Sequence, residues 1–90
     1  MSVIEDKINS GATIVDVRTS EEFSEEHYPN AINIPVDQLL ARIAEFGEKN
    51  NPLVLYCASG SRSAYASKIL KTSGYTDVVN AGGLFDMPNM

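Results

Sequence analysis

The sequence is poor in the residues that build disulfides, metal sites and basic surfaces. It has one cysteine, one histidine and no tryptophan among its 90 residues. A single cysteine cannot close an internal disulfide, and no Cys/His spacing resembles a zinc site. Lysine and arginine number 7 against 12 aspartates and glutamates, so the formal net charge is −5. Nucleic acid is therefore not an expected partner, because binding it requires a basic surface.

Long hydrophobic runs are also missing. The apolar stretches are too short to cross a bilayer, which takes about 20 apolar residues in a helix, so no membrane association is expected. Residues 1–11 lack the basic start and apolar centre of a signal peptide, which predicts a cytoplasmic location. The length and the hydrophobic content of 43% fit one small globular domain spanning residues 1–90. We expect this domain to be a monomer.

Strand and helix patterns alternate along the chain. Strands are expected at residues 13–17, 31–34, 53–56 and 77–79. Helices are expected before Gly11, after a Thr19/Glu22 capping box, over residues 36–43 and over residues 63–71. Residues 36–43 have the clearest amphipathic period, with apolar side chains at Val36, Leu39, Leu40 and Ile43. The alternation predicts a three-layer α/β domain, with a small, mostly parallel sheet flanked by helices on both faces.

The one cysteine lies where its thiol is expected to be reactive. Cys57 follows the apolar run 53–56, typical of a strand buried on both faces, and precedes the helical pattern 63–71. Ligands of such sheets bind at the carboxyl ends of the strands. Backbone N–H groups at a strand–helix junction favour an anion there, so the thiol should ionise readily and supply a thiolate nucleophile.

Several roles are compatible with this cysteine. The plainest is a small buried hydrophobe, but the strand–loop–helix setting and the nearby Arg62 favour a nucleophile. Cysteine phosphatases also use a thiolate in an amide-lined loop. Four residues separate Cys57 from Arg62 here, one fewer than in the phosphatase loop, so the smaller loop favours a single sulfur atom over a phosphate. A non-enzymatic sulfur carrier or partner-binding module stays open as an alternative.

Four blocks of residues occur together in order along the chain. They are Asp16-Val17-Arg18 with Glu22-Phe23, residues 29–35, the loop Cys57–Ser63, and Ala81-Gly82-Gly83. With these blocks the chain resembles the single-domain rhodaneses, a sulfurtransferase family, over nearly its whole length. The resemblance implies that Cys57 takes a sulfur from a small anionic donor such as thiosulfate, becomes a persulfide, and passes the sulfur to a thiophilic acceptor such as cyanide or a thiol. It implies no metal or organic cofactor, and a protein acceptor is also compatible with it.

The loop after Cys57 is expected to bind the substrate. Its residues are Ala58, Ser59, Gly60, Ser61, Arg62 and Ser63. Their backbone amides can stabilise both the thiolate and the anionic persulfide, and Gly60 allows a tight curl with the backbone close to the ligand. Arg62 has two possible roles: its forked guanidinium either contacts an anionic donor or braces the loop by pairing with a carboxylate.

Polar residues outside the loop are expected to be structural. Asp16, Arg18 and Glu22 are interpreted as a charge network at the end of the first strand. His27 is interpreted as a turn residue, because a thiolate that is already ionised needs no general base. Gly82-Gly83 is expected to form a tight turn close to the active loop.

Two departures from the family pattern affect the expected site. Asn30 stands where the family usually has glycine, a mild change because asparagine tolerates a positive φ better than most residues. The chain ends at Met90 without the aromatic helix, often containing tryptophan, that usually follows the Gly-Gly turn, and Pro88 restricts any helix there. The pocket wall after Gly83 and the donor preference are therefore left open.

Overall fold

A parallel sheet with strand order β2-β1-β3-β4 forms the centre of the computed structural model, which describes residues 2–89. The strands are β1 (Thr13–Asp16), β2 (Ile32–Asn33), β3 (Leu53–Cys57) and β4 (Val78–Gly83). The α-helices are α1 (Val3–Asn9), α2 (Ser20–Glu25) and α3 (Ser61–Thr72). Three short 3₁₀ turns complete the fold: η1 (Val36–Gln38), η2 (Ile43–Phe46) and η3 (Leu84–Asp86).

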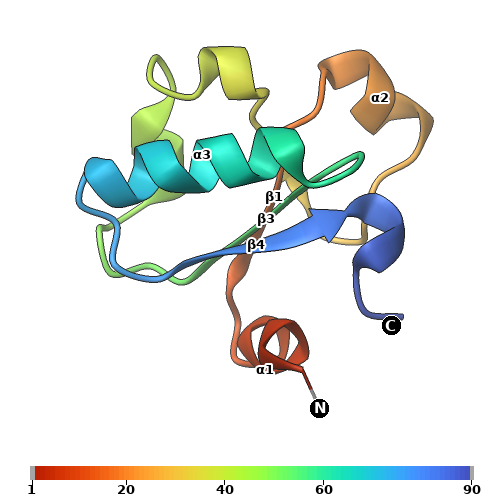
Figure 1. Cartoon of the computed structure of the whole chain (residues 1–90), viewed down its shortest axis with the longest axis horizontal. Helices are drawn as coiled ribbons and strands as arrows, with labels where there is room; N and C mark the ends of the chain where they lie inside the picture. The colour runs from red at the N-terminus through yellow and green to blue at the C-terminus, as the bar shows by residue number, and fades with distance from the viewer. Residues whose placement is uncertain (1, 90) are drawn as a thin grey trace.

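The two faces of the sheet are covered by different helices (Figure 1), because alternate side chains of each strand point to opposite faces. On one face, Val15 and Leu55 pack with Ala66 and Leu70 of α3. On the other face, Ile14, Val54 and Tyr56 pack with partly buried residues of α1. The predicted three-layer α/β architecture with a parallel sheet and helices on both faces is confirmed.

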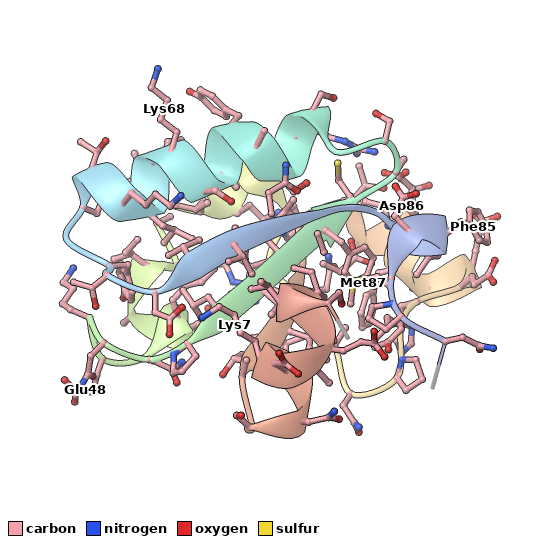
Figure 2. All side chains as sticks on the ribbon, turned by 60° about the horizontal axis from the view of Figure 1, so that its bottom comes forward. Lys7, Glu48, Lys68, Phe85, Asp86 and Met87 are labelled. Carbon is pink, nitrogen blue, oxygen red and sulfur yellow. The ribbon has the colours of Figure 1, made fainter. Side chains whose placement is uncertain are left out.

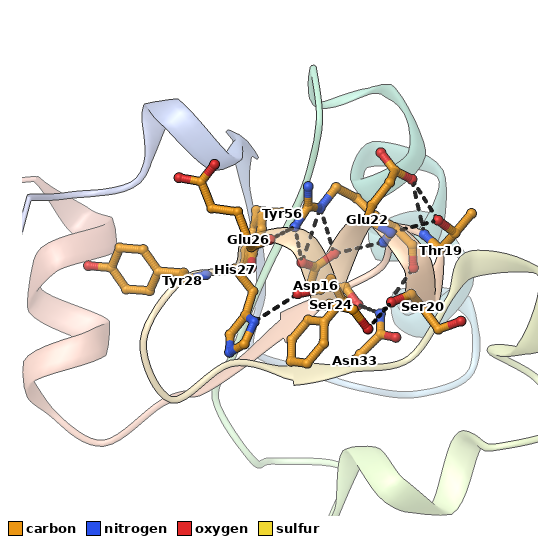
Figure 3. Close-up of polar contacts among 12 residues, drawn as sticks. Asp16, Thr19, Ser20, Glu22, Ser24, Glu26, His27, Tyr28, Asn33 and Tyr56 are labelled. Atoms are coloured by element: carbon orange, nitrogen blue, oxygen red, sulfur yellow. Dashed lines mark hydrogen bonds and ion pairs between the residues drawn. The ribbon is translucent and has the colours of Figure 1, made fainter.

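The capping box predicted at Thr19 and Glu22 is present at the start of α2. The Thr19 hydroxyl accepts a hydrogen bond from the Glu22 N–H at 3.2 Å, and the Glu22 carboxylate accepts one from the Thr19 N–H at 3.1 Å. Figure 3 shows the two side chains facing each other. These bonds satisfy N–H groups that have no partner within the helix.

The amphipathic helix predicted over residues 36–43 is wrong. This stretch forms the 3₁₀ turns η1 and η2 joined by further turns, and its backbone bonds, such as Leu39 N–H to Val36 O, mostly span three residues. Leu39 is buried, whereas Leu40 is 65% exposed, so the expected apolar face does not form. A helix this short gains little from its own hydrogen bonds, and contacts with the core determine the backbone path instead.

The last strand is longer than predicted. Residues 77–79 were expected to form it, but β4 runs from Val78 to Gly83. The Gly-Gly pair therefore ends the strand, and the tight turn predicted there is wrong. An irregularity in the pairing of β3 with β4 brings Gly83 opposite Cys57. Asn and Gly are depleted in strands, so residues 80–83 gave no strand signal, and their pairing with β3 comes from the tertiary structure. No helix among residues 2–89 is long and apolar enough to span a bilayer.

Candidate active site

The carboxyl ends of three neighbouring strands meet at one edge of the sheet. Because all pairings are parallel, Asp16 at the end of β1 lies beside Tyr56 of β3, and Cys57 lies beside Gly83 of β4. The loop from Cys57 leads directly into α3, whose first residue is Ser61. The parallel sheet therefore gathers the blocks 16–18, 57–63 and 81–83 at the edge where such folds bind ligands.

The loop after β3 curls around the Cys57 sulfur. The Gly60 N–H donates to Sγ at 2.9 Å, and the Ser63 N–H lies at 3.4 Å. Gly60 adopts φ +102°, a conformation that L side chains rarely adopt. The turn thus directs backbone N–H groups onto the sulfur, as predicted for a loop that holds an anion.

The environment of Cys57 favours its ionised form. Burial opposes ionisation of the thiol, but the hydrogen-bond donors around Sγ outweigh it and lower the pKa of Cys57: they are the Ser63 hydroxyl, when it turns to the sulfur, and the backbone N–H groups of Ser63, Gly60 and Ser59. The cause is hydrogen bonding to the charged form, which stabilises a thiolate even where water is excluded. The cysteine therefore has both the position and the acidity of a nucleophile.

The sulfur is nevertheless covered in this state. Cys57 is 0% exposed, whereas its neighbours Ala58 and Ser59 are exposed on the loop surface. A surface hollow adjoins the loop and is lined by Arg18, Glu22, Glu25, Glu26, Ala58, Leu84 and Phe85. The hollow therefore reaches the loop at Ala58, next to the buried sulfur.

Arg62 is engaged by a carboxylate from a distant part of the chain. Its guanidinium donates to both oxygens of Glu22, at 2.8 and 3.1 Å, across 40 positions of sequence. Glu22, which also caps α2, thus links this helix to α3. Of the two roles considered for Arg62, the structure shows the brace.

The Arg62–Glu22 pair makes stability depend on pH. The hydrogen bond from Arg62 is the main reason why the pKa of Glu22 falls from 4.5 to about 2. A lowered folded-state pKa stabilises the fold fully above pH 4.5, and this contribution is lost as the pH falls towards about 2. We expect Glu22→Gln to be less stable than wild type at neutral pH, with the difference closing through that window in urea unfolding. A difference that stays constant to the lowest pH would contradict this.

Asp16 and Arg18 form a buried ion pair beneath the site. The Arg18 side chain donates to the Asp16 carboxylate at 2.7 to 3.1 Å, and its Nη2 also donates to the Glu26 carbonyl at 2.6 Å. Asn33 of β2 donates to the carbonyls of both residues. Figure 3 shows Asp16 within this network, with Tyr56 beside it. The predicted structural network is confirmed for Asp16 and Arg18, whereas Glu22 pairs with Arg62.

Two residues of β4, Gly83 and Asn80, contact the loop that follows Cys57. A Cβ at Gly83 would lie 2.3 Å from the Ala58 carbonyl oxygen, so only glycine fits here, and the predicted closeness of Gly82-Gly83 to the active loop is confirmed. Asn80 donates to the Gly60 carbonyl at 3.2 Å and accepts the Ser63 hydroxyl at 2.6 Å. Sequence reasoning missed Asn80, because an exposed polar residue on an edge strand carries no signal of its partner.

Other residues take the structural places expected of them. His27 stacks on Phe23 with ring centroids 3.8 Å apart, and its Nδ1 lies 2.9 Å from the Phe23 carbonyl oxygen. Asn30 adopts φ 68°, as its replacement of glycine predicted. Within residues 2–89 no three His, Cys, Asp or Glu side chains are grouped closely enough to hold a metal ion.

The C-terminal segment packs on the α1 side of the sheet. Met87 is buried, and the Tyr28 hydroxyl donates to the Pro88 carbonyl at 2.6 Å. Phe85 is 85% exposed and projects from η3 at the periphery of the molecule (Figure 2), next to the hollow described above. Tyr28 and Met87 are therefore core residues, whereas Phe85 borders the hollow beside the loop.

A central parallel strand that ends in a cysteine, followed by an amide-lined loop and a helix, defines an α/β domain with a cysteine whose pKa is lowered at the carboxyl end of the sheet. The family model for the rhodanese-like domain matches residues 2–86 of this sequence. The chain therefore belongs to the rhodanese-like domain family, as its sequence blocks predicted.

Individual relatives agree with this assignment. The chain is 45% identical over 74 residues to thiosulfate sulfurtransferase PspE of Escherichia coli (strain K12), covering 81% of this chain and 71% of that protein. A solved structure described as a rhodanese with anions from E. coli matches with a TM-score of 0.80 and 43% identity, over 87% of this chain and 95% of that one. The chain is also 36% identical over 67 residues to a putative sulfur carrier protein, YrkF of Bacillus subtilis (strain 168), covering 74% of this chain and 36% of that longer protein.

Proposed function

We propose that this chain is a sulfurtransferase that moves a sulfane sulfur from thiosulfate or a persulfide donor to a thiophilic acceptor through a persulfide on Cys57. The observation that carries the proposal is the set of backbone N–H groups directed at Sγ, led by Gly60 at 2.9 Å. The relative named thiosulfate sulfurtransferase and the structure described with bound anions support it. The small, closed loop favours a single sulfur over a phosphoryl group.

The proposed cycle consists of two displacements at sulfur. The Cys57 thiolate attacks the outer sulfur of thiosulfate, a new S–S bond forms, and sulfite leaves with the electron pair of the broken bond. The terminal sulfur of the resulting persulfide then carries the negative charge. Cyanide attacks that sulfur and leaves as thiocyanate, which returns the thiolate. No proton is transferred in either step, so the absence of a general base beside the sulfur is no obstacle.

The loop amides serve both states of the cycle. In the resting enzyme they hold the thiolate, and after transfer the same N–H groups can stabilise the anionic persulfide, one bond further out. Because these donors are fixed by the backbone, they need no rearrangement as the charge moves. The loop residues 58–63 are therefore proposed as the substrate-binding segment, through their backbone N–H groups.

Intact mass after incubation with thiosulfate tests the proposal. We expect a gain of one sulfur atom on Cys57, which then disappears when cyanide is added while thiocyanate forms. A gain of sulfur without turnover to thiocyanate or to a low-molecular-weight thiol would identify a carrier module, the alternative that the relative named as a putative sulfur carrier supports. No gain of sulfur, together with hydrolysis of an aryl phosphate, would contradict sulfur transfer in favour of phosphatase activity.

Arg62→Ala is expected to weaken transfer from anionic and neutral donors equally. The guanidinium is committed to Glu22, so its loss loosens the loop rather than removing a donor contact. A pair of this exposure contributes at most ~1 kcal/mol to stability. Even if all of this energy were lost from the transition state, kcat/KM would fall by only about fivefold. Arg62→Lys should not restore activity, because an ammonium cannot bridge both carboxylate oxygens in the same way. A selective rise in KM for thiosulfate over a neutral persulfide donor would instead show direct contact with the donor.

A further inference from the structure

The Ser63 hydroxyl lies within hydrogen-bond distance of several acceptors, but it has only one proton to donate. Its Oγ lies 2.6 Å from Asn80 Oδ1, 3.2 Å from the Gly60 carbonyl, and 3.4 Å from both Cys57 Sγ and the Gly82 carbonyl. A serine hydroxyl carries one proton and can donate it to one strong acceptor at a time. The Asn80 contact is much the shortest and lies in the normal range of an O–H···O bond. The proton therefore points to Asn80 and away from the sulfur.

The orientation of the Asn80 amide is set by backbone groups. Its Oδ1 accepts the Gly82 N–H at 2.9 Å, and its Nδ2 donates to the Gly60 carbonyl at 3.2 Å. A flipped amide would place N–H against N–H at Gly82 and oxygen against oxygen at Gly60. The Gly60 carbonyl also accepts the Ala64 N–H at 2.9 Å, so it is already satisfied without the hydroxyl. An acceptor oxygen is thus held in front of Ser63 by the backbone.

We propose, building on the sulfur-transfer function given above, that Asn80 is a positioning residue which competes with the Cys57 sulfur for the single hydroxyl proton of Ser63. While Asn80 holds this proton, the thiolate is stabilised by backbone N–H groups alone. A thiolate with one hydrogen bond fewer is more basic and more nucleophilic. The proton stays on Ser63 Oγ throughout, and only the rotation of the hydroxyl changes.

Nearby charged groups do not depend on Asn80. Arg62 interacts electrostatically with Cys57, but its side chain is paired with Glu22. On the β4 side, the Asp86 carboxylate accepts the Gly83 N–H at 2.8 Å. Asn80 is itself an exposed residue on the edge strand β4, so its substitution is compatible with folding. Changes in thiol ionisation can therefore be traced to the hydroxyl.

Titration of the thiol in four variants tests the proposal. We expect Asn80→Ala to lower the pKa of Cys57 by about one unit, because the freed hydroxyl turns to the sulfur. Ser63→Ala alone should change it little, and Ser63→Ala added to Asn80→Ala should raise it back by about one unit. Thiolate absorbance and the pH dependence of alkylation both report this ionisation. Cys57 is the only cysteine of the chain, so Cys57→Ser supplies the blank.

Two other outcomes would overturn the proposal. If the hydroxyl already donates to the sulfur, Ser63→Ala alone raises the thiol pKa and Asn80→Ala leaves it unchanged. If Asn80 only braces the loop, Asn80→Ala raises the pKa equally with and without the Ser63 hydroxyl. Asn80→Asp keeps the acceptor oxygen but adds a negative charge and faces the Gly60 carbonyl with an oxygen, so the thiol pKa should rise in this variant and not fall. The titration contains no sulfur donor, so its result is independent of whether the chain transfers sulfur.

Discussion

Cys57→Ser is expected to abolish sulfur transfer, with a loss of at least about a thousandfold in kcat, the scale seen when a covalent nucleophile is removed. A serine hydroxyl is too weakly acidic to ionise in this loop, and an oxygen at this position cannot form the persulfide. The fold should be retained, because serine is close in size to cysteine and its oxygen can accept the same Gly60 N–H that now reaches Sγ at 2.9 Å. Thiocyanate formation and thermal unfolding measure the two effects separately.

Ser10→Ala is a suitable control for the Cys57 variant. Ser10 lies at the end of α1, at the opposite end of the sheet from the loop, and it is exposed. This variant should transfer sulfur at the wild-type rate. Appreciable transfer by Cys57→Ser, in a preparation free of wild-type protein, would rule out the persulfide mechanism. If Cys57→Ser lost the fold as well as transfer, the result would support the alternative role of Cys57 as a small buried hydrophobe.

Gly83→Ala is expected to disable the site by a different route. The added Cβ would lie 2.3 Å from the Ala58 carbonyl oxygen and 3.0 Å from its carbon, both backbone atoms that cannot move without the loop. Gly83 has φ −94°, which alanine adopts freely, so the effect is purely steric. Overpacking of this kind costs about 1–3 kcal/mol, and the loop must shift away from the sulfur. We expect transfer to fall by well over tenfold and the thiol pKa to rise.

Gly11→Ala separates this steric effect from a general loss of stability. Gly11 has φ +93° and nothing within 4 Å of its Cβ position, so alanine there costs only backbone strain, about 1–2 kcal/mol. Both variants should therefore unfold at lower denaturant concentrations, but only Gly83→Ala should lose activity. Normal activity in a folded Gly83→Ala protein would show that the loop tolerates displacement and that the amide positions around the sulfur are not critical.

Most of the secondary structure could be predicted because its signals are local. The Thr19/Glu22 box, the β-branched run before Asp16 and the uniformly apolar β3 each specify their element with residues close in sequence. Residues 36–43 show the limit of this reasoning. Their spacing is that of a helix, but the stretch lies between Pro35 and Gly47 and is shaped by the core contacts of Leu39 and Phe46, which no local pattern records.

The same limit applies to the candidate site: residues close in sequence were predicted, and contacts between distant segments were not. The reactive position of Cys57 follows from a strand, a loop and a helix that are consecutive in sequence, and the structure adds the N–H groups that lower its pKa. Arg62 had two possible partners on sequence grounds, and only the placement of α2 beside α3 provides Glu22. Asn80 could not be predicted at all, since its role comes from the register of β4 against the loop.

The sequence alone determined the class of fold, the single nucleophile candidate and the loop that surrounds it, because these depend on residues that are neighbours along the chain. The tertiary structure decided what that loop rests on: Glu22 for Arg62, Asn80 for Ser63 and Gly83 for the Ala58 carbonyl. Each of these contacts joins segments far apart in sequence. Their geometry is set by how the parallel strands align and by where α2 and α3 lie relative to each other, which only the folded chain specifies.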